Sequence, residues 1–155
     1  MEKKITTKVI KKPAVKKPAV VEKDVYIEGV GRRKTSVARV RIYTTRSAKK
    51  GSFDIIVNEK PYGVYFPLEK QKKTAIAPFT ATDENIPVSV VVKGGGINGQ
   101  AEALRLGLSR ALVAHNPAYR EKLKALGFMK RDPRMVERKK FGSRKARRPQ
   151  QWRKR

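Results

Sequence analysis

Residues 94–99 read Gly-Gly-Gly-Ile-Asn-Gly, a spacing that in other proteins can bind a phosphorylated ligand. This spacing matches the GxGxxG pattern of dinucleotide-binding loops, whose glycines let the backbone approach a pyrophosphate at a helix N-terminus. Such a loop normally follows the first strand of a parallel βαβ unit, with an acidic residue on a strand about 20 positions later. Here that stretch is Tyr119-Arg120-Glu121, inside a predicted helix. The pattern therefore favours a structural turn, whose amides and Lys93 could also contact an RNA phosphate. A nucleotide-dependent enzyme is the alternative.

The other residue types give little support for catalysis or metal binding. The chain contains no cysteine, which excludes disulfides, cysteine-ligated zinc and thiol catalysis. His115 is the one histidine, and it falls at the C-terminal end of a predicted helix, where a cation is favoured. The acidic residues are few and mostly adjoin lysine or arginine, so no carboxylate pair or metal cluster is indicated. We therefore predict no catalytic residue, no metal and no cofactor.

A second candidate site is the basic segment 31–36, which separates two predicted strands. Arg32, Arg33 and Lys34 are three adjacent cations on a short turn, and they cannot all form local ion pairs. A phosphate backbone satisfies such a cluster, whereas the alternative is a solvated hairpin tip. We therefore interpret the segment as a phosphate clamp.

The C-terminal segment 128–155 carries the strongest signal. It contains thirteen lysine or arginine residues and two acids, with almost no apolar spacing from which a core could be built. Such a segment cannot bury enough apolar surface to offset the entropy of ordering it alone, so it needs a polyanion to lie on. RNA fits best, because Phe128, Phe141 and Trp152 can stack on bases beside the arginine side chains.

Net charge divides the chain into three predicted parts. The formal charge of +26 separates into +6 for residues 1–23, +9 for 24–127 and +11 for 128–155. We expect 1–23, with a tandem Lys-Lys-Pro-Ala-Val repeat, to be a disordered basic arm that is either an electrostatic tether or dispensable. Residues 24–127 form the predicted globular domain and 128–155 an extended basic tail. No apolar run is long enough to span a membrane, and no secretory or mitochondrial leader pattern is present, so we predict a cytoplasmic protein.

The central part shows the alternation of a small β-sheet. On the second predicted strand Ala38, Val40 and Ile42 point one way, while Arg39 and Arg41 lie on the partly basic outer face. The fourth strand is almost entirely β-branched, which predicts a central and well-buried position. The predicted strands are 25–28, 36–43, 53–57 and 86–92.

Three helices are predicted, at 68–76, 99–114 and 117–127. The first stops before Pro78, and the second is capped by Asn98. The third has Asn116 as its cap, Pro117 in its first turn and Gly127 at its end. These elements predict an α+β fold, a small sheet of four or more strands with helices on one face.

Several of these segments together resemble the universal small-subunit ribosomal protein S-nine family, of bacterial type. They occur in order over about residues 25–155, which makes a chance match implausible. The opening signature is Gly-Val-Gly-Arg-Arg-Lys-Thr-Ser-Val-Ala-Arg-Val. The matching segments are 29–40, 92–96, 99–101, 116–117, 126–127, 132–134, 137–142, 144–148 and the terminal pair 154–155.

The resemblance implies a fold and a location that the residues alone did not show. The domain would share its fold with domain 2 of ribosomal protein S-five, including a left-handed βαβ crossover, which departs from the usual right-handed preference. It would lie on the head of the small subunit, against the 3′ major domain of the rRNA and beside other small-subunit ribosomal proteins. The tail would pass between rRNA strands, and its tip would reach the anticodon stem-loop of peptidyl-site tRNA.

The resemblance also assigns residues to these roles. The tRNA-binding tip would be Arg153, Lys154 and Arg155, although the family often has serine where this chain has Arg153. The rRNA-binding residues would be Arg32, Arg33, Lys34, Arg39, Arg41, Lys93, Arg138, Lys139, Lys140, Arg144, Lys145, Arg147 and Arg148. The alternative binding function is a free nucleic-acid compactor or RNA chaperone, which would use the same charges without a single stoichiometric site.

Overall fold

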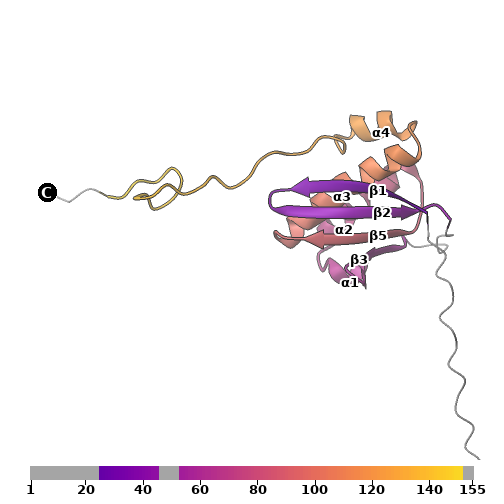
Figure 1. The fold of residues 1–155 in the computed structure, drawn as a ribbon, viewed down its shortest axis with the longest axis horizontal. Helices are drawn as coiled ribbons and strands as arrows, with labels where there is room; N and C mark the ends of the chain where they lie inside the picture. Colours follow the sequence, from indigo (N-terminus) through magenta and orange to yellow (C-terminus); the bar gives the residue numbers. More distant parts are fainter. Residues whose placement is uncertain (1–24, 46–52, 152–155) are drawn as a thin grey trace, which may run out of the picture.

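The computed structural model describes residues 25–45 and 53–151, which contain a five-stranded sheet and four helices followed by a tail (Figure 1). The predicted arm 1–23 and the tip residues Arg153, Lys154 and Arg155 lie outside the described residues. The strands are β1 (Tyr26–Arg33), β2 (Ser36–Tyr43), β3 (Ile55–Val57), β4 (Lys60–Pro61) and β5 (Val88–Lys93). The helices are α1 (Tyr62–Tyr65), α2 (Glu69–Thr82), α3 (Ile97–His115) and α4 (Tyr119–Ala125). The predicted α+β class is confirmed.

The strand order is β1-β2-β5-β3-β4. Strands β1 and β2 form an antiparallel hairpin, β5 pairs antiparallel with β2, and β4 pairs antiparallel with β3. Strands β3 and β5 are parallel, so the chain between them must cross over, and it does so through α1 and α2. Strand β5 therefore lies in the middle of the sheet, as its composition predicts.

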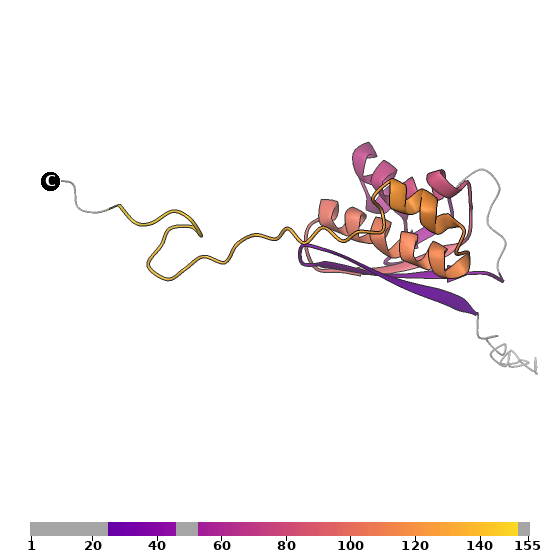
Figure 2. The same ribbon diagram turned by 90° about the horizontal axis from the view of Figure 1, so that it is seen from above.

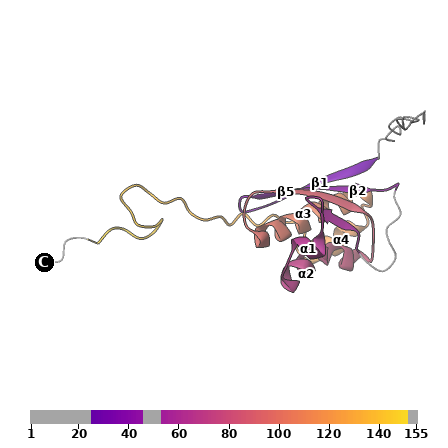
Figure 3. The same ribbon diagram turned by 90° about the horizontal axis from the view of Figure 1, so that it is seen from below.

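The helices lie on one face of the sheet, and the other face carries no helix (Figures 2 and 3). This asymmetry follows from the alternation along the strands. Ala38, Val40 and Ile42 are fully buried on the helix side, whereas Arg39 between them is exposed. The same alternation in β5 leaves Val91 exposed, so this strand is buried on one face only and not on both.

Helix α3 provides most of the apolar surface that covers the sheet. Leu104, Leu108 and Leu112 are fully inaccessible to solvent and recur with helical spacing, as the sequence predicts. Complete burial of each such side chain contributes about 2 kcal/mol to the free energy of unfolding. The N-cap of helix α3 is Gly96, two residues before the predicted cap Asn98, and the Asn98 side chain instead accepts a hydrogen bond from Gln71 in α2.

Strand β1 lies directly against the backbone of α3. A Cβ atom added to Gly31 would lie 1.8 Å from the carbonyl oxygen of Ala103, and one added to Gly29 would lie 2.3 Å from that of Gly107. The sequence predicted that β1 ends at residue 28 and that these glycines lead into a turn, which is wrong. The strand runs on to Arg33, and the turn consists of Lys34 and Thr35. The glycines allow close packing and do not end the strand.

Helix α2 continues past the point where a proline was predicted to stop it. Pro78 lies inside the helix, which continues to Thr82 and is followed by Asp83 in the left-handed conformation. Proline costs the helix one backbone hydrogen bond. Burial of the next residue offsets this cost, because Phe79 is fully buried and stacks on Phe53.

Helix α4 follows its prediction more closely, since the Asn116 side chain caps the turn before it and Gly127 has a φ of +73° just after it.

The tail leaves the globule as an extended chain (Figure 1). Residues 131–140 contain no helix or strand. A tight turn follows, in which the amide of Arg144 donates to the carbonyl of Arg148 at 2.9 Å. Phe141 is fully exposed beside this turn. Within the described residues, no helix is both long and apolar enough to cross a membrane.

The contact between β1 and α3 makes a sharp prediction for Gly31→Ala. The new methyl group would overlap the α3 backbone, so we expect the free energy of unfolding to fall by about 3 kcal/mol, measured by urea denaturation. Gly63→Ala is the matched control, because a Cβ at Gly63 meets no atom within 4 Å. This control should leave stability unchanged or raise it by up to about 1 kcal/mol. Equal stability of the two variants would contradict the close approach.

Candidate nucleic-acid interface

The uncovered face of the sheet is a mixed array of cations and valines. In the strand register Arg32 lies opposite Val37, and Arg39 lies between Val30 and Val91. Lys93 pairs with the other side of Val37. Because side chains opposite one another in antiparallel strands point to the same face, each of these cations is flanked by an aliphatic group. The face therefore offers both charge and apolar contact to a ligand.

Glu28 organises two of the arginines on this face. Its carboxylate accepts hydrogen bonds from Arg39 Nε at 3.0 Å and from Arg41 Nε at 3.3 Å. Arg41 also lies over the ring of Tyr26, with its guanidinium carbon 4.8 Å from the ring centroid. The hydrogen bond from Arg39, followed by that from Arg41, lowers the pKa of Glu28 below its usual value. The two guanidinium groups are thus held in place before any ligand arrives.

A hollow of about 160 Å³ lies between these side chains. Val37 and Val91 contribute its apolar surface, and Arg39, Arg41 and Lys93 contribute its charge. This combination suits a sugar-phosphate backbone, whose phosphates attract the cations while its sugars pack on the aliphatic groups. Three predicted rRNA-binding residues are therefore brought together here.

The glycine segment packs beneath the β1–β2 turn. Gly94 and Gly95 both have positive φ values, +73° and +66°. A Cβ on Gly94 would lie 2.7 Å from the carbonyl oxygen of Thr35, and one on Gly95 would lie 2.0 Å from the hydroxyl of Ser36. These residues are glycine because the turn leaves no room for a side chain, which supports the structural interpretation. Lys34 projects from the same turn and is exposed.

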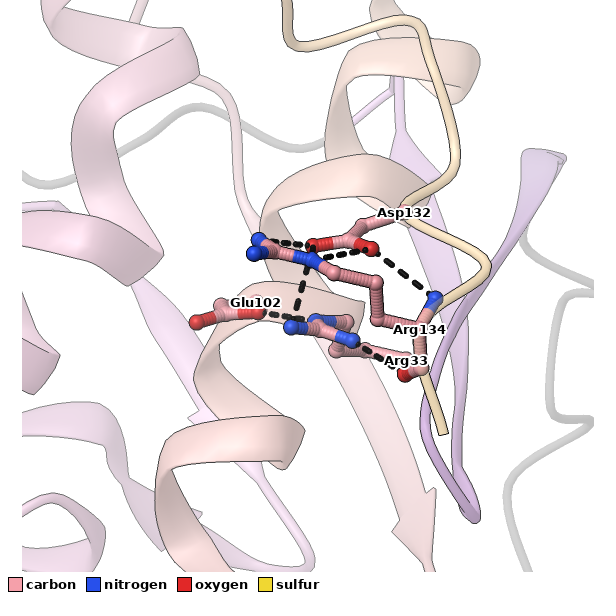
Figure 4. A network of polar contacts seen from close by, with 4 residues as sticks. All are labelled: Arg33, Glu102, Asp132 and Arg134. Carbon is pink, nitrogen blue, oxygen red and sulfur yellow. Dashed lines mark hydrogen bonds and ion pairs between the residues drawn. The ribbon is translucent and has the colours of Figure 1, made fainter. Parts of the chain in front are cut away.

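Arg33 differs from its two cationic neighbours. Arg32 and Lys34 are exposed, whereas the side chain of Arg33 is 11% exposed and forms ion pairs with Glu102 and Asp132 (Figure 4). The alternation of β1 explains this, because Arg33 lies on the same face as Gly29 and Gly31, against α3. The sequence had suggested one cluster of three cations, but in the structure Arg33 points to the opposite face from Arg32. The two-residue alternation of the strand is the signal from which this difference could have been predicted.

The predicted tail cations are all exposed, and they come from a short stretch around the tight turn. One of them is already paired: Arg147 Nε donates to Glu137 at 2.8 Å, and its second nitrogen also contacts this carboxylate. These hydrogen bonds lower the pKa of Glu137. The exposed residues are Arg138, Lys139, Lys140, Arg144, Lys145, Arg147 and Arg148.

No arrangement for catalysis emerges among the described residues. They contain no group of three or more histidine, cysteine, aspartate or glutamate side chains that could hold a metal ion. The pKa of Tyr119 is raised, chiefly because its hydroxyl donates a hydrogen bond to Glu84. This pair ties α4 to the loop before β5, which is a packing role.

Comparison with known proteins identifies the family of the chain. The profile of the family described as Ribosomal protein S9/S16 matches residues 31–155. The chain belongs to this family. It is also 44% identical, over 129 residues, to the small ribosomal subunit protein uS9 of two strains of Thermus thermophilus. These alignments cover 82% of this chain and 96% of each relative. The predicted family and a ribosomal location are therefore confirmed.

Family membership supports the structural explanation of the glycine segment over a nucleotide-dependent enzyme. Ribosomal proteins of this family are structural proteins and not enzymes. The match includes both the glycine segment and the basic tail, whereas residues 1–30 precede it. The GxGxxG spacing is thus a packing motif in a ribosomal protein.

The sequence did not reveal Glu102 and Asp132 as partners of Arg33, because nothing local links them.

The sheet face predicts an unusual effect of Glu28→Gln on RNA binding. Loss of the carboxylate removes a negative charge from the face and frees Arg39 and Arg41. We expect the gain from removing the negative charge to outweigh the loss of orientation of the two arginines. Structured RNA should therefore bind more tightly, with the slope of log K against log salt steeper by up to about one unit. Filter binding between 50 and 300 mM salt would measure this. Glu121→Gln, the same change on α4, is the control and should have little effect. Weaker binding by the Glu28 variant would show that the carboxylate is needed to position the arginines.

Proposed function

We propose that this protein is a structural component of the small ribosomal subunit that binds rRNA through its open sheet face and its basic tail and contacts peptidyl-site tRNA with its C-terminal tip. The observation that carries this proposal is the uncovered sheet face, on which ordered cations alternate with aliphatic side chains. Relatives named as small ribosomal subunit proteins, similar over most of their length, support it.

The globular domain supplies a preorganised part of the rRNA interface. Arg39 and Arg41 are already oriented by Glu28, so they lose little side-chain freedom when a phosphate replaces the solvent around them. Arg33 is left out of the proposed phosphate contacts, because its guanidinium nitrogens are engaged within the protein. The globular residues proposed to bind rRNA are Arg32, Lys34, Arg39, Arg41 and Lys93.

The tail supplies the larger share of the charge. Its cations are exposed along an extended path, as expected for a segment that neutralises closely packed RNA strands and orders on them. Phe141, fully exposed in the free chain, is available to stack on a base. The tail residues proposed to bind rRNA are Arg138, Lys139, Lys140, Arg144, Lys145, Arg147 and Arg148.

Three finer parts of the proposal come from the family resemblance. The tip residues Arg153, Lys154 and Arg155 would hold the tRNA backbone, which gives affinity without reading sequence and so accepts every tRNA. Other small-subunit proteins would be neighbours on the subunit head. The left-handed crossover shared with ribosomal protein S-five is assigned to the β3–β5 connection. These three parts stay predictions.

Crosslinking in living cells would distinguish this function from a free RNA compactor. We expect crosslinks of the sheet face and tail to fall in one region of small-subunit rRNA, and crosslinks of residues 152–155 to carry tRNA anticodon arms. The physical reason is that a stoichiometric site presents the same phosphates to the same cations in every particle. A broad spread over unrelated RNAs would favour the compactor and contradict the proposal.

Removal of Arg153, Lys154 and Arg155 tests the tip. Subunit assembly should remain intact, while peptidyl-site tRNA binding weakens and its salt dependence flattens by about one unit of log slope for each lost phosphate contact. Replacing Arg153 and Arg155 by lysine preserves the charge and should preserve the slope. If truncated subunits bind tRNA with an unchanged salt slope, the tip does not contact tRNA phosphates.

A further inference from the structure

We propose that Arg33 is a positioning residue that clamps the base of the tail to the globule and thereby sets the direction in which the tail leaves it. The clamp consists of Arg33 in β1, Glu102 in α3, and Asp132 and Arg134 at the start of the tail (Figure 4). The clamp itself is a property of the free protein. Its consequence for RNA rests on the proposed function.

Each guanidinium nitrogen of Arg33 has a different partner. Nε donates to Glu102 at 2.5 Å, Nη1 donates to the backbone carbonyl of Arg134 at 2.7 Å, and Nη2 lies 3.0 Å from the Asp132 carboxylate. Two of these contacts join residues that are 69 and 101 positions apart in the chain. Only the planar fork of arginine can serve three partners in these directions, and lysine has a single nitrogen.

The base of the tail is folded to meet Arg33. The Asp132 side chain accepts a hydrogen bond from the backbone amide of Arg134 at 3.0 Å, which makes a local turn. Pro133, between them, restricts the backbone of this turn. The Arg134 side chain also donates to Asp132, and this interaction is the main reason that the pKa of Asp132 lies well below its usual value. The turn presents both a carboxylate and a carbonyl to one guanidinium.

The fixed side of the clamp is rigid. Arg33 directly follows the segment of β1 that packs against the α3 backbone, and Glu102 projects from α3 itself. A second attachment lies just before the clamp, where Arg105 of α3 stacks on the ring of Phe128 at 5.1 Å. Beyond Arg134, the hydrogen bonds and ion pairs found for described residues up to 151 are made within the tail. The clamp is thus the last described anchor to the globule.

A clamp at this point affects the position of every residue in the tail beyond it. The 21 residues after Arg134 can extend to about 70 Å, at about 3.3 Å per residue. A small change of direction at residues 132–134 therefore displaces the distal tail by many ångströms. Fixing the direction raises the effective concentration of the tail cations at their phosphates without any contact of Arg33 with RNA.

Distance measurement in the free, full-length protein tests the clamp without RNA. Because the chain has no cysteine, spin labels at Ala114→Cys and Val136→Cys would report only the distance from the far end of α3 to the start of the tail. We expect a narrow distance distribution that broadens at least twofold with Arg33→Gln, Arg33→Lys or Asp132→Asn. Arg32→Gln, an equal loss of charge on the adjacent exposed arginine, is the control and should change nothing.

Asp132→Asn keeps this test decisive even where Arg33 variants fail to fold, because Asp132 lies in the tail outside the secondary structure. An unchanged distribution width in this variant would overturn the clamp, whatever the protein binds.

RNA binding then separates positioning from phosphate contact. With a small-subunit head rRNA fragment as the probe, Arg33→Gln should weaken binding roughly threefold to tenfold with an unchanged salt slope. A phosphate ligand would instead lose about one unit of slope. For Asp132→Asn, the two explanations predict opposite changes in RNA affinity. Removal of a negative charge alone should tighten binding, whereas loss of the clamp should weaken it.

Tighter binding by Asp132→Asn would overturn the positioning role. Absence of specific rRNA binding by the unaltered protein would count against the proposed function and leave the distance result standing.

Discussion

The direct contact between the backbones of β1 and α3 is the constraint on which the rest of this structure depends. Gly29, Gly31 and Gly107 lie where any Cβ atom would meet the opposing backbone or side chains at less than 3 Å. Through this contact the longest helix is held across the hairpin of β1 and β2. The other helices complete a layer on the same side of the sheet (Figures 2 and 3). The remaining face is left open, which makes it available for binding.

Because of the same contact, the charged residues on the two faces of β1 have different roles. Exposed residues such as Arg32 and Glu28 belong to the open face, while Arg33 is turned toward α3. A buried arginine is tolerated only if it is paired, and the acids that pair with it come from the helix and from the tail. One strand thus contributes both to a binding surface and to the anchoring of a distant segment.

Acidic residues are scarce in a chain of formal charge +26, and their positions are informative. Glu28, Asp132 and Glu137 each hold one or more arginines in a defined orientation. Isolated exposed ion pairs contribute little to stability, so these carboxylates matter more for the geometry of the cations than for the fold. A protein this basic repels itself in isolation, and a polyanionic partner removes that repulsion. Preorganised cations reduce the entropic cost of binding such a partner.

Features that depend on neighbouring residues could be predicted from the amino-acid sequence. Alternation predicted the inner and outer faces of β2, including the burial of Val40 and the exposure of Arg39, because successive side chains in a strand point to opposite faces. The order of the motifs along the chain predicted the family. Alternation needs only neighbouring residues, and the family signal is a series of short motifs whose order can be read directly along the chain.

Features that depend on distant partners became visible only in the folded protein. Helix α2 runs through Pro78 because Phe79 packs into the core, and β1 runs through Gly31 because α3 needs the space. Arg33 is drawn inward by Glu102 and by the Arg134 carbonyl, which lie 69 and 101 positions along the chain. The free energy of these contacts exists only once the fold has brought the partners together, so local pattern could not reveal them.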